Sequence, residues 1–354
     1  MPHPYFDGKE FDVRILVGMS GGLDSTYAAL KLIDEGHEVE GAVVVMHGHT
    51  ELADAREAAA ALGIRLHELD ATEKFNAVKD NFVDEYSRGR TPNPCIVCNP
   101  WVKFRVLADF ATEHGFDRIA TGHYAKTVCL SDGLSVRYTL AKARDLRKDQ
   151  TYMLHRLPED VLAILMLPLG DEVKTEVREK ALARGLKAAE KKESQEICFI
   201  PDGDYAAYIE AIRGPFPEGD FVLEDGKVIG RHKGLIRYTV GQRKGLGVAY
   251  GERIFVSRID SFKNEIVLSV VGTYIDRVML SDAVFSGISE PEPGTEIKAE
   301  VKLRYLAAPV STTAVFHGEG RVELVLDVPQ KAVTPGQSAV IYDGDTVLFG
   351  GFID

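Results

Sequence analysis

Four cysteines occur in the 354 residues, and three of them could do chemistry: Cys95, Cys98 and Cys198. Four are too few for a disulfide scaffold, and a structural zinc site usually needs four ligands, whereas the chain has no second Cys-x-x-Cys. Two uses remain. Cys98 and Cys198 can form a thiol pair that carries sulfur and then closes a disulfide, or all three can ligate an iron–sulfur cluster with one open iron. Cys129 lies alone on an alternating apolar stretch, and we expect it in a core.

A second chemical signal is the glycine-rich turn Ser-Gly-Gly-Leu-Asp-Ser at residues 20–25. It lies between the segment 13–17, which is apolar except for Arg14 and typical of a buried strand, and an amphipathic stretch at 24–35, typical of a helix. Free backbone N–H groups and the helix dipole attract anions at such a turn, although a tight turn without a ligand is the simpler alternative. The Gly-Lys-Ser/Thr of a Walker A loop is absent, so the turn predicts a phosphate site of another kind.

Alternating strands and helices must position these residues. The repeat strand–helix–strand–helix–strand in the first half predicts a parallel sheet with crossover helices. Two prolines at 92 and 94 exclude regular helix, so we expect the Cys-x-x-Cys in a loop. The expected strands are 13–17, 38–46, 64–69 and 118–120, and the expected helices are 24–35, 51–62, a helix through 75–86, and 103–114.

The pattern changes twice further along the chain. Prolines and glycines cluster after residue 205, and strict alternation of apolar and polar residues dominates beyond about residue 275. Asp343-Gly344 predicts a hairpin turn. We therefore expect an α/β protein with three domains: a parallel-sheet domain at 1–204, a small central domain at 205–274 and a C-terminal β-barrel at 275–354.

Composition and charge narrow the class of protein. The longest apolar run, 161–169, is too short to span a bilayer, and the polar N-terminus does not resemble a secretory signal, so we expect a cytoplasmic protein. The net charge of -12 argues weakly against a nucleic-acid partner. However, residues 227–258 hold eight Lys or Arg against Glu252 alone, and 137–156 is also basic. An acidic body with basic stripes is compatible with a polyanion bound at one face.

Eight motifs occur in an order that resembles one family over nearly the whole chain. They are GMSGGLDS at 18–25, TPNPCIVCN at 91–99, KF at 103–104, TGHYAK at 121–126, KDQTYML at 148–154, SQEICFIP at 194–201, HKGLIRYTVGQRKGLG at 232–247 and TPGQSAVIYDGD at 334–345. The chain resembles the tRNA-specific 2-thiouridylases, the MnmA family, which belong to the PP-loop ATP pyrophosphatases. The resemblance implies a PP-loop domain, a small central domain and a β-barrel, with tRNA across all three.

The resemblance also implies the reaction. ATP with Mg²⁺ adenylates the C2 oxygen of the wobble uridine (U34) of tRNA, and sulfur then replaces AMP. In the persulfide version Cys198 carries sulfur from a donor protein and Cys98 is the resolving thiol. In the cluster version Cys95, Cys98 and Cys198 hold [4Fe-4S]. By the resemblance, Asp24 helps to bind magnesium, and the ATP-binding residues are Gly18, Met19, Ser20, Gly21, Gly22, Leu23, Asp24, Ser25, Met46 and Gly122.

The expected tRNA contacts combine the resemblance with the basic stripe. They are Asn93, Pro94, Cys95, Lys148, Asp149, Gln150, Arg243, Lys244, Arg304 and Tyr305. The alternative to tRNA contact for residues 148–150 is that they form a solvated charged turn. The alternative for Arg304 is that it lies on the ordinary polar face of a strand. His123, in Thr-Gly-His-Tyr at the end of an expected strand, is placed beside the ATP site.

The chain departs from the family pattern at two places. Many members carry aspartate where Cys95 stands, and a third cysteine favours the cluster. The segment after Met46 is also shorter than usual. Two other functions remain open: an amide-forming PP-loop ligase, which would give no reason for Cys98 and Cys198, and a non-enzymatic RNA-binding protein, which would give no reason for an ATP loop. The sequence does not indicate the oligomeric state.

Overall fold

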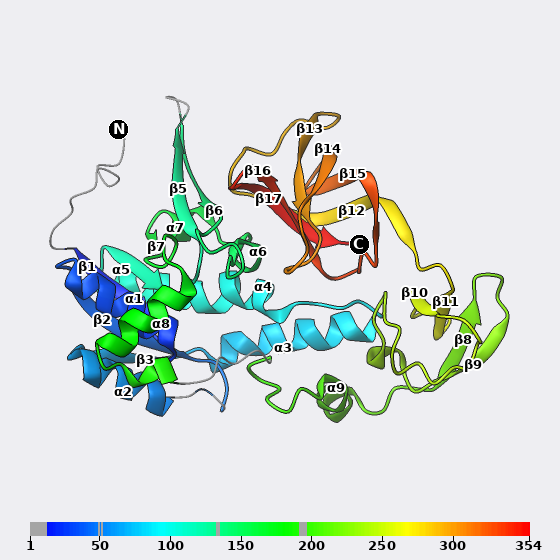
Figure 1. Ribbon diagram of the computed structural model, residues 1–354, viewed down its shortest axis with the longest axis horizontal. Helices are drawn as coiled ribbons and strands as arrows, with labels where there is room; N and C mark the ends of the chain where they lie inside the picture. The colour runs from blue at the N-terminus through cyan, green and yellow to red at the C-terminus, as the bar shows by residue number, and fades with distance from the viewer. Residues whose placement is uncertain (1–12, 49, 51, 132–134, 191–196) are drawn as a thin grey trace.

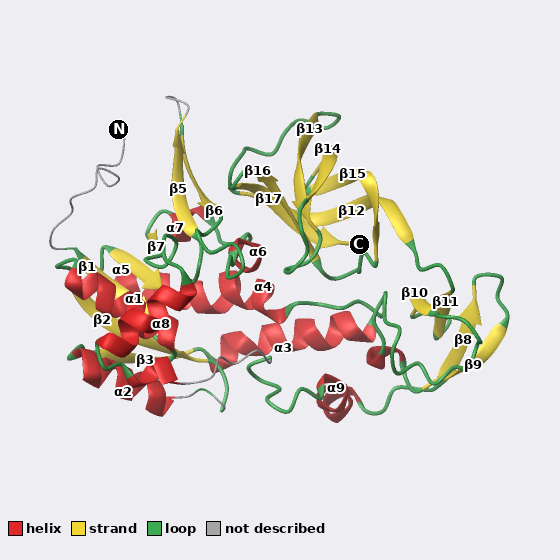
Figure 2. Ribbon diagram, in the orientation of Figure 1, coloured by secondary structure: helices red, strands yellow, loops and turns green. Residues whose placement is uncertain are grey.

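A computed structural model describes residues 13–48, 50, 52–131, 135–190 and 197–354 (Figure 1). The polar N-terminus, from which we expect no secretory signal, lies outside the described residues. An α/β part comes first in the chain, a small β-sheet follows, and a larger antiparallel β-structure ends the chain (Figure 2). Within the described ranges, no helix combines the length and the apolar character that crossing a bilayer requires.

The α/β part is built on a five-stranded parallel sheet with the order β3-β2-β1-β4-β7. The expected strands are confirmed with ends shifted by one or two residues. The apolar runs form strands because both faces of the sheet are covered, which is the usual situation of a parallel sheet. The strands are β1 (Arg14–Gly18), β2 (Glu38–Val45), β3 (Leu66–Asp70), β4 (Arg118–Thr121) and β7 (Leu165–Met166).

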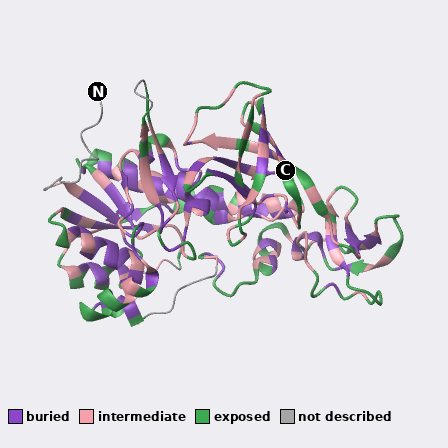
Figure 3. Cartoon of the chain, turned by 45° about the horizontal axis from the view of Figure 1, so that its top comes forward, coloured by how far each residue is buried: buried purple, intermediate pink, exposed green. Residues whose placement is uncertain are grey.

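Alternate residues of β1 build the two cores. Ile15 and Val17 pack with α1 and α2, whereas Leu16 packs with α3 and α5 on the opposite face. Figure 3 shows these layers as the buried interior of the α/β part. The helices are α1 (Leu23–Asp34), α2 (Leu52–Leu62), α3 (Thr72–Ser87), α5 (Phe104–Glu113) and α8 (Lys174–Ala183).

The expectation that the Cys-x-x-Cys lies in a loop is wrong. It forms α4 (Pro94–Cys98), which continues as a π-helix, η1 (Asn99–Lys103), into α5. Pro94 occupies the first turn, where its missing N–H costs nothing, and the Asn93 side chain accepts a hydrogen bond from the Cys95 N–H at 3.1 Å. The proline therefore starts the helix rather than preventing it. The π-helical turn matches the frequent occurrence of such turns at functional sites.

A hairpin of β5 (Lys126–Ser131) and β6 (Val136–Ala141) projects from the α/β part (Figure 1). The expectation that Cys129 is a core residue is wrong, because its side chain is exposed on β5. A two-stranded hairpin has no layer over both faces, so alternation there does not indicate a core. The remaining elements up to residue 190 are α6 (Thr151–Leu154), α7 (Glu159–Leu162) and η2 (Lys187–Glu190).

The small sheet has the strand order β10-β11-β8-β9, with Phe221, Ile266 and Leu268 fully buried in its core. The chain enters it through α9, whose Asp204 side chain caps the helix by accepting from the Ala207 N–H. Its elements are α9 (Tyr205–Arg213), β8 (Gly219–Leu223), β9 (Val228–His232), η3 (Leu235–Arg237), β10 (Phe255–Asp260) and β11 (Glu265–Ser269).

The C-terminal part is a closed antiparallel barrel, as expected. Its order is β12-β15-β14-β13-β16-β17, and β12 also pairs with β17, which closes the ring. The predicted turn at Asp343-Gly344 joins β16 to β17. The strands are β12 (Tyr274–Phe285), β13 (Glu296–Lys302), β14 (Val310–Gly318), β15 (Arg321–Lys331), β16 (Ser338–Asp343) and β17 (Thr346–Ile353).

Candidate active site

The glycine-rich turn joins the carboxyl end of β1 to α1. Ser25 fixes its shape, because its Oγ accepts from the Ser20 N–H at 3.1 Å and donates to the Gly22 carbonyl at 3.2 Å. Gly21 has a φ of +76°, and a Cβ there would lie 2.3 Å from the backbone of Asp54. Only glycine fits both the conformation and the close approach of α2. The turn therefore presents backbone N–H groups at a helix N-terminus, as an anion site requires.

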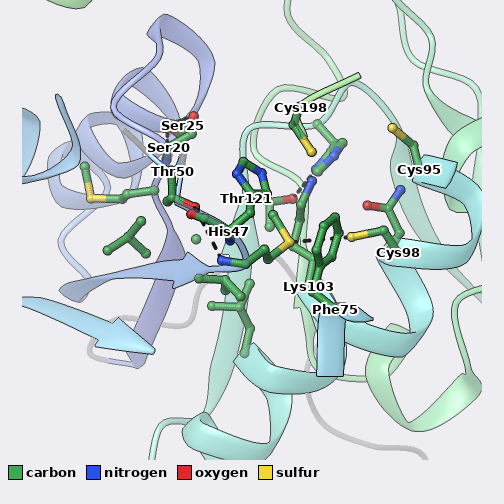
Figure 4. A pocket seen from close by; sticks show the side chains of 18 of the residues that line it. Ser20, Ser25, His47, Thr50, Phe75, Cys95, Cys98, Lys103, Thr121 and Cys198 are labelled. Carbon is green, nitrogen blue, oxygen red and sulfur yellow. Dashed lines mark hydrogen bonds between the residues drawn. The ribbon is translucent and has the colours of Figure 1, made fainter. Parts of the chain in front are cut away.

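The turn opens into a cavity of about 1040 Å³ that also holds the three cysteines. Figure 4 shows Ser20 and Ser25 at one side of this cavity and Cys95, Cys98 and Cys198 at the other. Residues that are far apart in sequence thus line one open cavity. Of the expected ATP-binding residues, those that line it are Gly18, Met19, Ser20, Asp24, Ser25, Met46 and Gly122.

Gly122 is required by packing. A Cβ at this position would lie 2.4 Å from the Asp24 carbonyl carbon and 2.5 Å from the Ser25 nitrogen. The end of β4 therefore touches the first turn of α1, and this contact fixes the height of the glycine-rich turn above the sheet. Any side chain at 122 would push the two elements apart.

The short segment after Met46 still reaches the cavity. His47 and Thr50 line it, and Thr50 Oγ1 donates to the His47 carbonyl at 2.8 Å. The His47 ring lies 5.5 Å from the ring of Phe75, which also lines the cavity. The side chains on either side of this short segment therefore contribute to the cavity wall.

Asp24 makes contacts that the sequence does not predict. Lys174 Nζ donates to both carboxylate oxygens of Asp24 at 2.6 and 2.7 Å, and the Tyr124 hydroxyl donates to Oδ1 at 3.1 Å. Lys174 begins α8, 150 residues away along the chain. The glycine-rich turn lacks a Walker lysine, yet a lysine from a remote helix lies beside it. No sequence motif marks Lys174, since only the tertiary fold brings it to Asp24.

The three cavity cysteines differ in exposure. Cys98 is 7% exposed, and its Sγ lies 3.6 Å from Met46 Sδ, while Cys95 and Cys198 are exposed. Burial raises the pKa of Cys98 to about 12. Cys198 is exposed as a whole residue, but the protein around its thiol removes part of its water, and this desolvation raises its pKa as well. Both thiols are therefore protonated at neutral pH in this conformation, so a base or a conformational change must precede thiolate chemistry.

Thiolates are the donors that an iron–sulfur cluster needs, and three of them face one cavity. However, within the described ranges no three His, Cys, Asp or Glu side chains lie close enough together to hold a metal ion. That finding concerns a single ion. A cubane binds each cysteine through a different iron and spaces its ligands more widely, and Cys95, Cys98 and Cys198 on the one cavity are the residues that would hold it.

Lys103 and His123 also line the cavity that holds the glycine-rich turn and the cysteines. Burial, and secondly the charge of Lys103, lower the pKa of His123 to about 3, so this imidazole is neutral. Its Nδ1 shares a 2.8 Å hydrogen bond with Thr121 Oγ1, which orients the ring. His123 thus lies where it was expected. The sequence marks Lys103 only as part of the Lys-Phe motif at 103–104 and does not predict that it belongs to the site. The structure adds it to the candidate site, because it lines the cavity.

Three family models together match almost the whole chain. The tRNA methyl transferase HUP domain matches residues 13–202, the tRNA methyl transferase PRC-barrel domain 207–270 and the Aminomethyltransferase beta-barrel domain 277–353. The tRNA-specific 2-thiouridylase MnmA of Geotalea uraniireducens is 42% identical over 360 residues, covering 96% of this chain and 95% of that protein. The chain belongs to the MnmA family of tRNA-specific 2-thiouridylases.

Other MnmA proteins match equally well. That of Acetivibrio thermocellus is 41% identical over 358 residues, covering 96% of this chain and 99% of the relative, and that of Syntrophotalea carbinolica is 42% identical with 98% and 99% covered. A solved structure, the U34-tRNA thiolase NcsA from Methanococcus maripaludis with its [4Fe-4S] cluster, is 18% identical with a TM-score of 0.36, covering 58% of this chain and 69% of NcsA. The likeness to NcsA is too weak to bear on the cysteines.

The family's Lys-Asp-Gln segment is divided between two roles. Asp149 is 3% exposed, and its carboxylate accepts from the Ala143 N–H at 3.1 Å and from Thr151 Oγ1 at 2.7 Å. A solvated turn is therefore wrong for Asp149, whose burial also disfavours direct tRNA contact. Gln150 lines the large cavity, and its Oε1 accepts from the Tyr124 N–H at 2.9 Å.

A second cavity, of about 480 Å³, lies between the Lys-Asp-Gln segment and the barrel. Tyr305 and Asp149 line it together with the basic side chains of Lys142, Arg147 and Lys302. The neighbouring Arg304 is exposed and donates to the Lys331 carbonyl at 2.7 Å. The structure thus brings two of the expected tRNA-contact segments to one basic cavity beside the active site.

Arg243 and Lys244 are exposed in the loop between η3 and β10 of the central part, and they line neither cavity. Other basic residues of this stripe are neutralised, since Arg231 pairs with Asp220 at 3.0 Å and Arg237 with Glu210 at 2.6 Å. The expected tRNA contacts therefore form separate patches along the chain, as a long polyanion would require.

Proposed function

We propose that this protein is an ATP-dependent tRNA-uridine 2-sulfurtransferase that thiolates the wobble uridine. The observation that carries the proposal is a single cavity that joins the glycine-rich turn to Cys98 and Cys198. One uridine placed there can meet an activated phosphate and a sulfur carrier without leaving the site. The names of the MnmA relatives support the same substrate and reaction.

The first step needs the phosphate end of the cavity. The N–H groups at residues 20–25 hold the pyrophosphate of ATP while the uridine C2 oxygen attacks the α-phosphate, and pyrophosphate leaves. Asp24 is the carboxylate at this turn that would hold Mg²⁺, which offsets the charge of the leaving group. Adenylation turns a poor leaving oxygen into a good one. His123 is neutral and accepts or donates hydrogen bonds without adding charge.

The second step needs the thiol end. Cys198 carries the terminal sulfur as a persulfide, formed from a sulfur-donor protein. The terminal sulfur attacks C2, and AMP leaves with the former C2 oxygen. Cys98 then attacks Cys198 Sγ, which forms the Cys98–Cys198 disulfide and releases 2-thiouridine; a thiol reductant resets the pair. A [4Fe-4S] cluster on Cys95, Cys98 and Cys198 is the alternative carrier, whereas the persulfide route needs only the two thiols of Cys98 and Cys198.

We place the tRNA across the basic patches. The anticodon loop reaches the cavity past Asn93, Pro94 and Cys95 on α4, and the exposed Arg243 and Lys244 of the central domain bind backbone phosphates further along. Tyr305 offers a ring for stacking on a splayed base.

Two rival functions explain fewer of the observed features. An amide-forming ligase leaves the cysteines unexplained, and a non-enzymatic RNA-binding protein leaves the ATP site unexplained. Such an enzyme acts where tRNA and its sulfur donor are available, in the cytoplasm.

The thiols give the clearest test of this function. Cys98→Ser and Cys198→Ser should each still release AMP or pyrophosphate with tRNA present but accumulate no 2-thiouridine, as measured by nucleoside mass spectrometry. Cys129→Ser is the matched control, because Cys129 is exposed on β5 and does not line the cavity. Wild-type thiolation by Cys198→Ser with a donor protein as sulfur source would contradict the proposal.

A further inference from the structure

Lys174 lies against the glycine-rich turn and has no part in the steps above. Its side chain is 9% exposed, and its Nζ bridges both carboxylate oxygens of Asp24. The Asp24 side chain is 34% exposed and lines the cavity, so Lys174 lies behind it as seen from the cavity. A buried lysine is rare unless it is paired, and here its partner is a carboxylate of the phosphate site.

The contacts hold this lysine firmly. Asp145 accepts from the Lys174 backbone N–H at 3.2 Å, and Nζ lies 5.7 Å from the centre of the Tyr124 ring, whose hydroxyl donates to the same Asp24. Asp24 is therefore oriented by two donors from two elements, one before β5 and one at the start of α8. This arrangement fixes the carboxylate before any nucleotide arrives.

The charges suggest why a cation is needed at this point. ATP carries several negative charges to a turn whose side chains include a carboxylate and no lysine. An unpaired Asp24 would repel the phosphates, because like charges a few ångströms apart repel one another. Paired with Lys174, the carboxylate contributes almost no net charge yet keeps its oxygens at the mouth of the turn.

We propose that Lys174 is a positioning residue of the ATP site, which holds the Asp24 carboxylate in place and offsets its charge so that the turn accepts a triphosphate. The inference rests on the proposed function, because it assigns the ATP of that reaction to this turn. The competing explanation is that Lys174 only ties α8 to α1 and contributes to stability.

The test measures ATP affinity by calorimetry with EDTA and with Mg²⁺. Lys174→Met removes the charge and should weaken metal-free binding at least about tenfold, while Mg²⁺ should recover part of the loss because it supplies positive charge beside Asp24. Lys174→Arg keeps the charge and should stay within about threefold of wild type. Adding Asp24→Asn to Lys174→Met removes the repulsion and should restore metal-free binding.

Lys31→Met is the matched control. Lys31 pairs with Glu172 at 2.8 Å and so ties α1 to the segment just before α8, but it does not line the cavity. It should lose stability like Lys174→Met and keep the wild-type ATP affinity.

If Lys174→Met does not fold, the single variant Asp24→Asn tests the same role of Lys174. It leaves the lysine charge uncompensated and should bind metal-free ATP several times more tightly than wild type, with less gain from Mg²⁺. Wild-type metal-free affinity in folded Lys174→Met, or weaker metal-free binding by Asp24→Asn, would overturn the role of Lys174. A wild-type protein that binds no ATP at all would instead overturn the proposed function.

Discussion

Gly122→Ala should damage the active site without touching any reacting group. The added Cβ would lie 2.4, 2.5 and 2.7 Å from three backbone atoms of Asp24 and Ser25, whereas ordinary contact begins at 3.4 Å. Backbone atoms cannot swing aside as a side chain can, so β4 and the first turn of α1 must separate by roughly 1 Å. Overpacking of this kind costs about 1 to 3 kcal/mol in the free energy of unfolding.

The same displacement moves the glycine-rich turn relative to the cysteines. A misplacement of about 1 Å can lower a reaction rate by about a hundredfold, so the single-turnover thiolation rate should fall much further than stability alone explains. Urea unfolding followed by circular dichroism gives the stability, and nucleoside mass spectrometry gives the rate. Gly48→Ala is the control, since a Cβ there meets nothing within 4 Å. If both variants match wild type in stability and rate, the packing argument is refuted.

Four further outcomes follow from the site. Asp24→Ala should abolish thiolation and leave tRNA affinity in filter binding nearly unchanged; retained ATP-dependent activity would contradict the assignment of the phosphate turn. Replacing Arg243 and Lys244 with alanine should flatten the salt dependence of tRNA binding by up to about two units of slope, and an unchanged slope would place the RNA elsewhere. Because burial raises the pKa of Cys98 from 9.0 to about 12 and the thiolate is the reactive form, its alkylation should keep rising about tenfold per pH unit from about pH 9 to about pH 11; a plateau near pH 9 would refute the buried-thiol description. Cys95→Asp should remain active and free of iron. If the wild type binds iron and the variant loses both the iron and the activity, the cluster is established instead.

Much of the fold follows from local patterns. The strand before the glycine-rich turn was predictable because the buried part of a parallel strand is a continuous apolar run, and residues 15–17 of β1 are apolar and buried. The barrel was predictable because residues of β13 and β15 alternate between the core and solvent. In both cases the signal lies within a few neighbouring residues.

The expectations that failed are those in which a local sequence rule was outweighed by helix capping or by tertiary structure. Two nearby prolines predict a break in the helix, but Pro94, with Asn93 as a side-chain cap, starts the helix that carries Cys98. Cys129 fits an alternating pattern, yet its hairpin has no second layer to bury it. The pairing of Lys174 with Asp24 depends on 150 residues of intervening fold, so no sequence spacing could predict it.

The most direct test of the central claim is the stoichiometry and position of the product. Purified protein is incubated with unmodified tRNA, ATP, Mg²⁺, a sulfur-donor protein and a thiol reductant. The amount of AMP released is compared with the amount of 2-thiouridine formed, and the position of 2-thiouridine in the tRNA is mapped by sequencing mass spectrometry. The account predicts one AMP for each 2-thiouridine, with all of the sulfur at the wobble position. AMP that accumulates without 2-thiouridine, or sulfur found at another position of the tRNA, would contradict it.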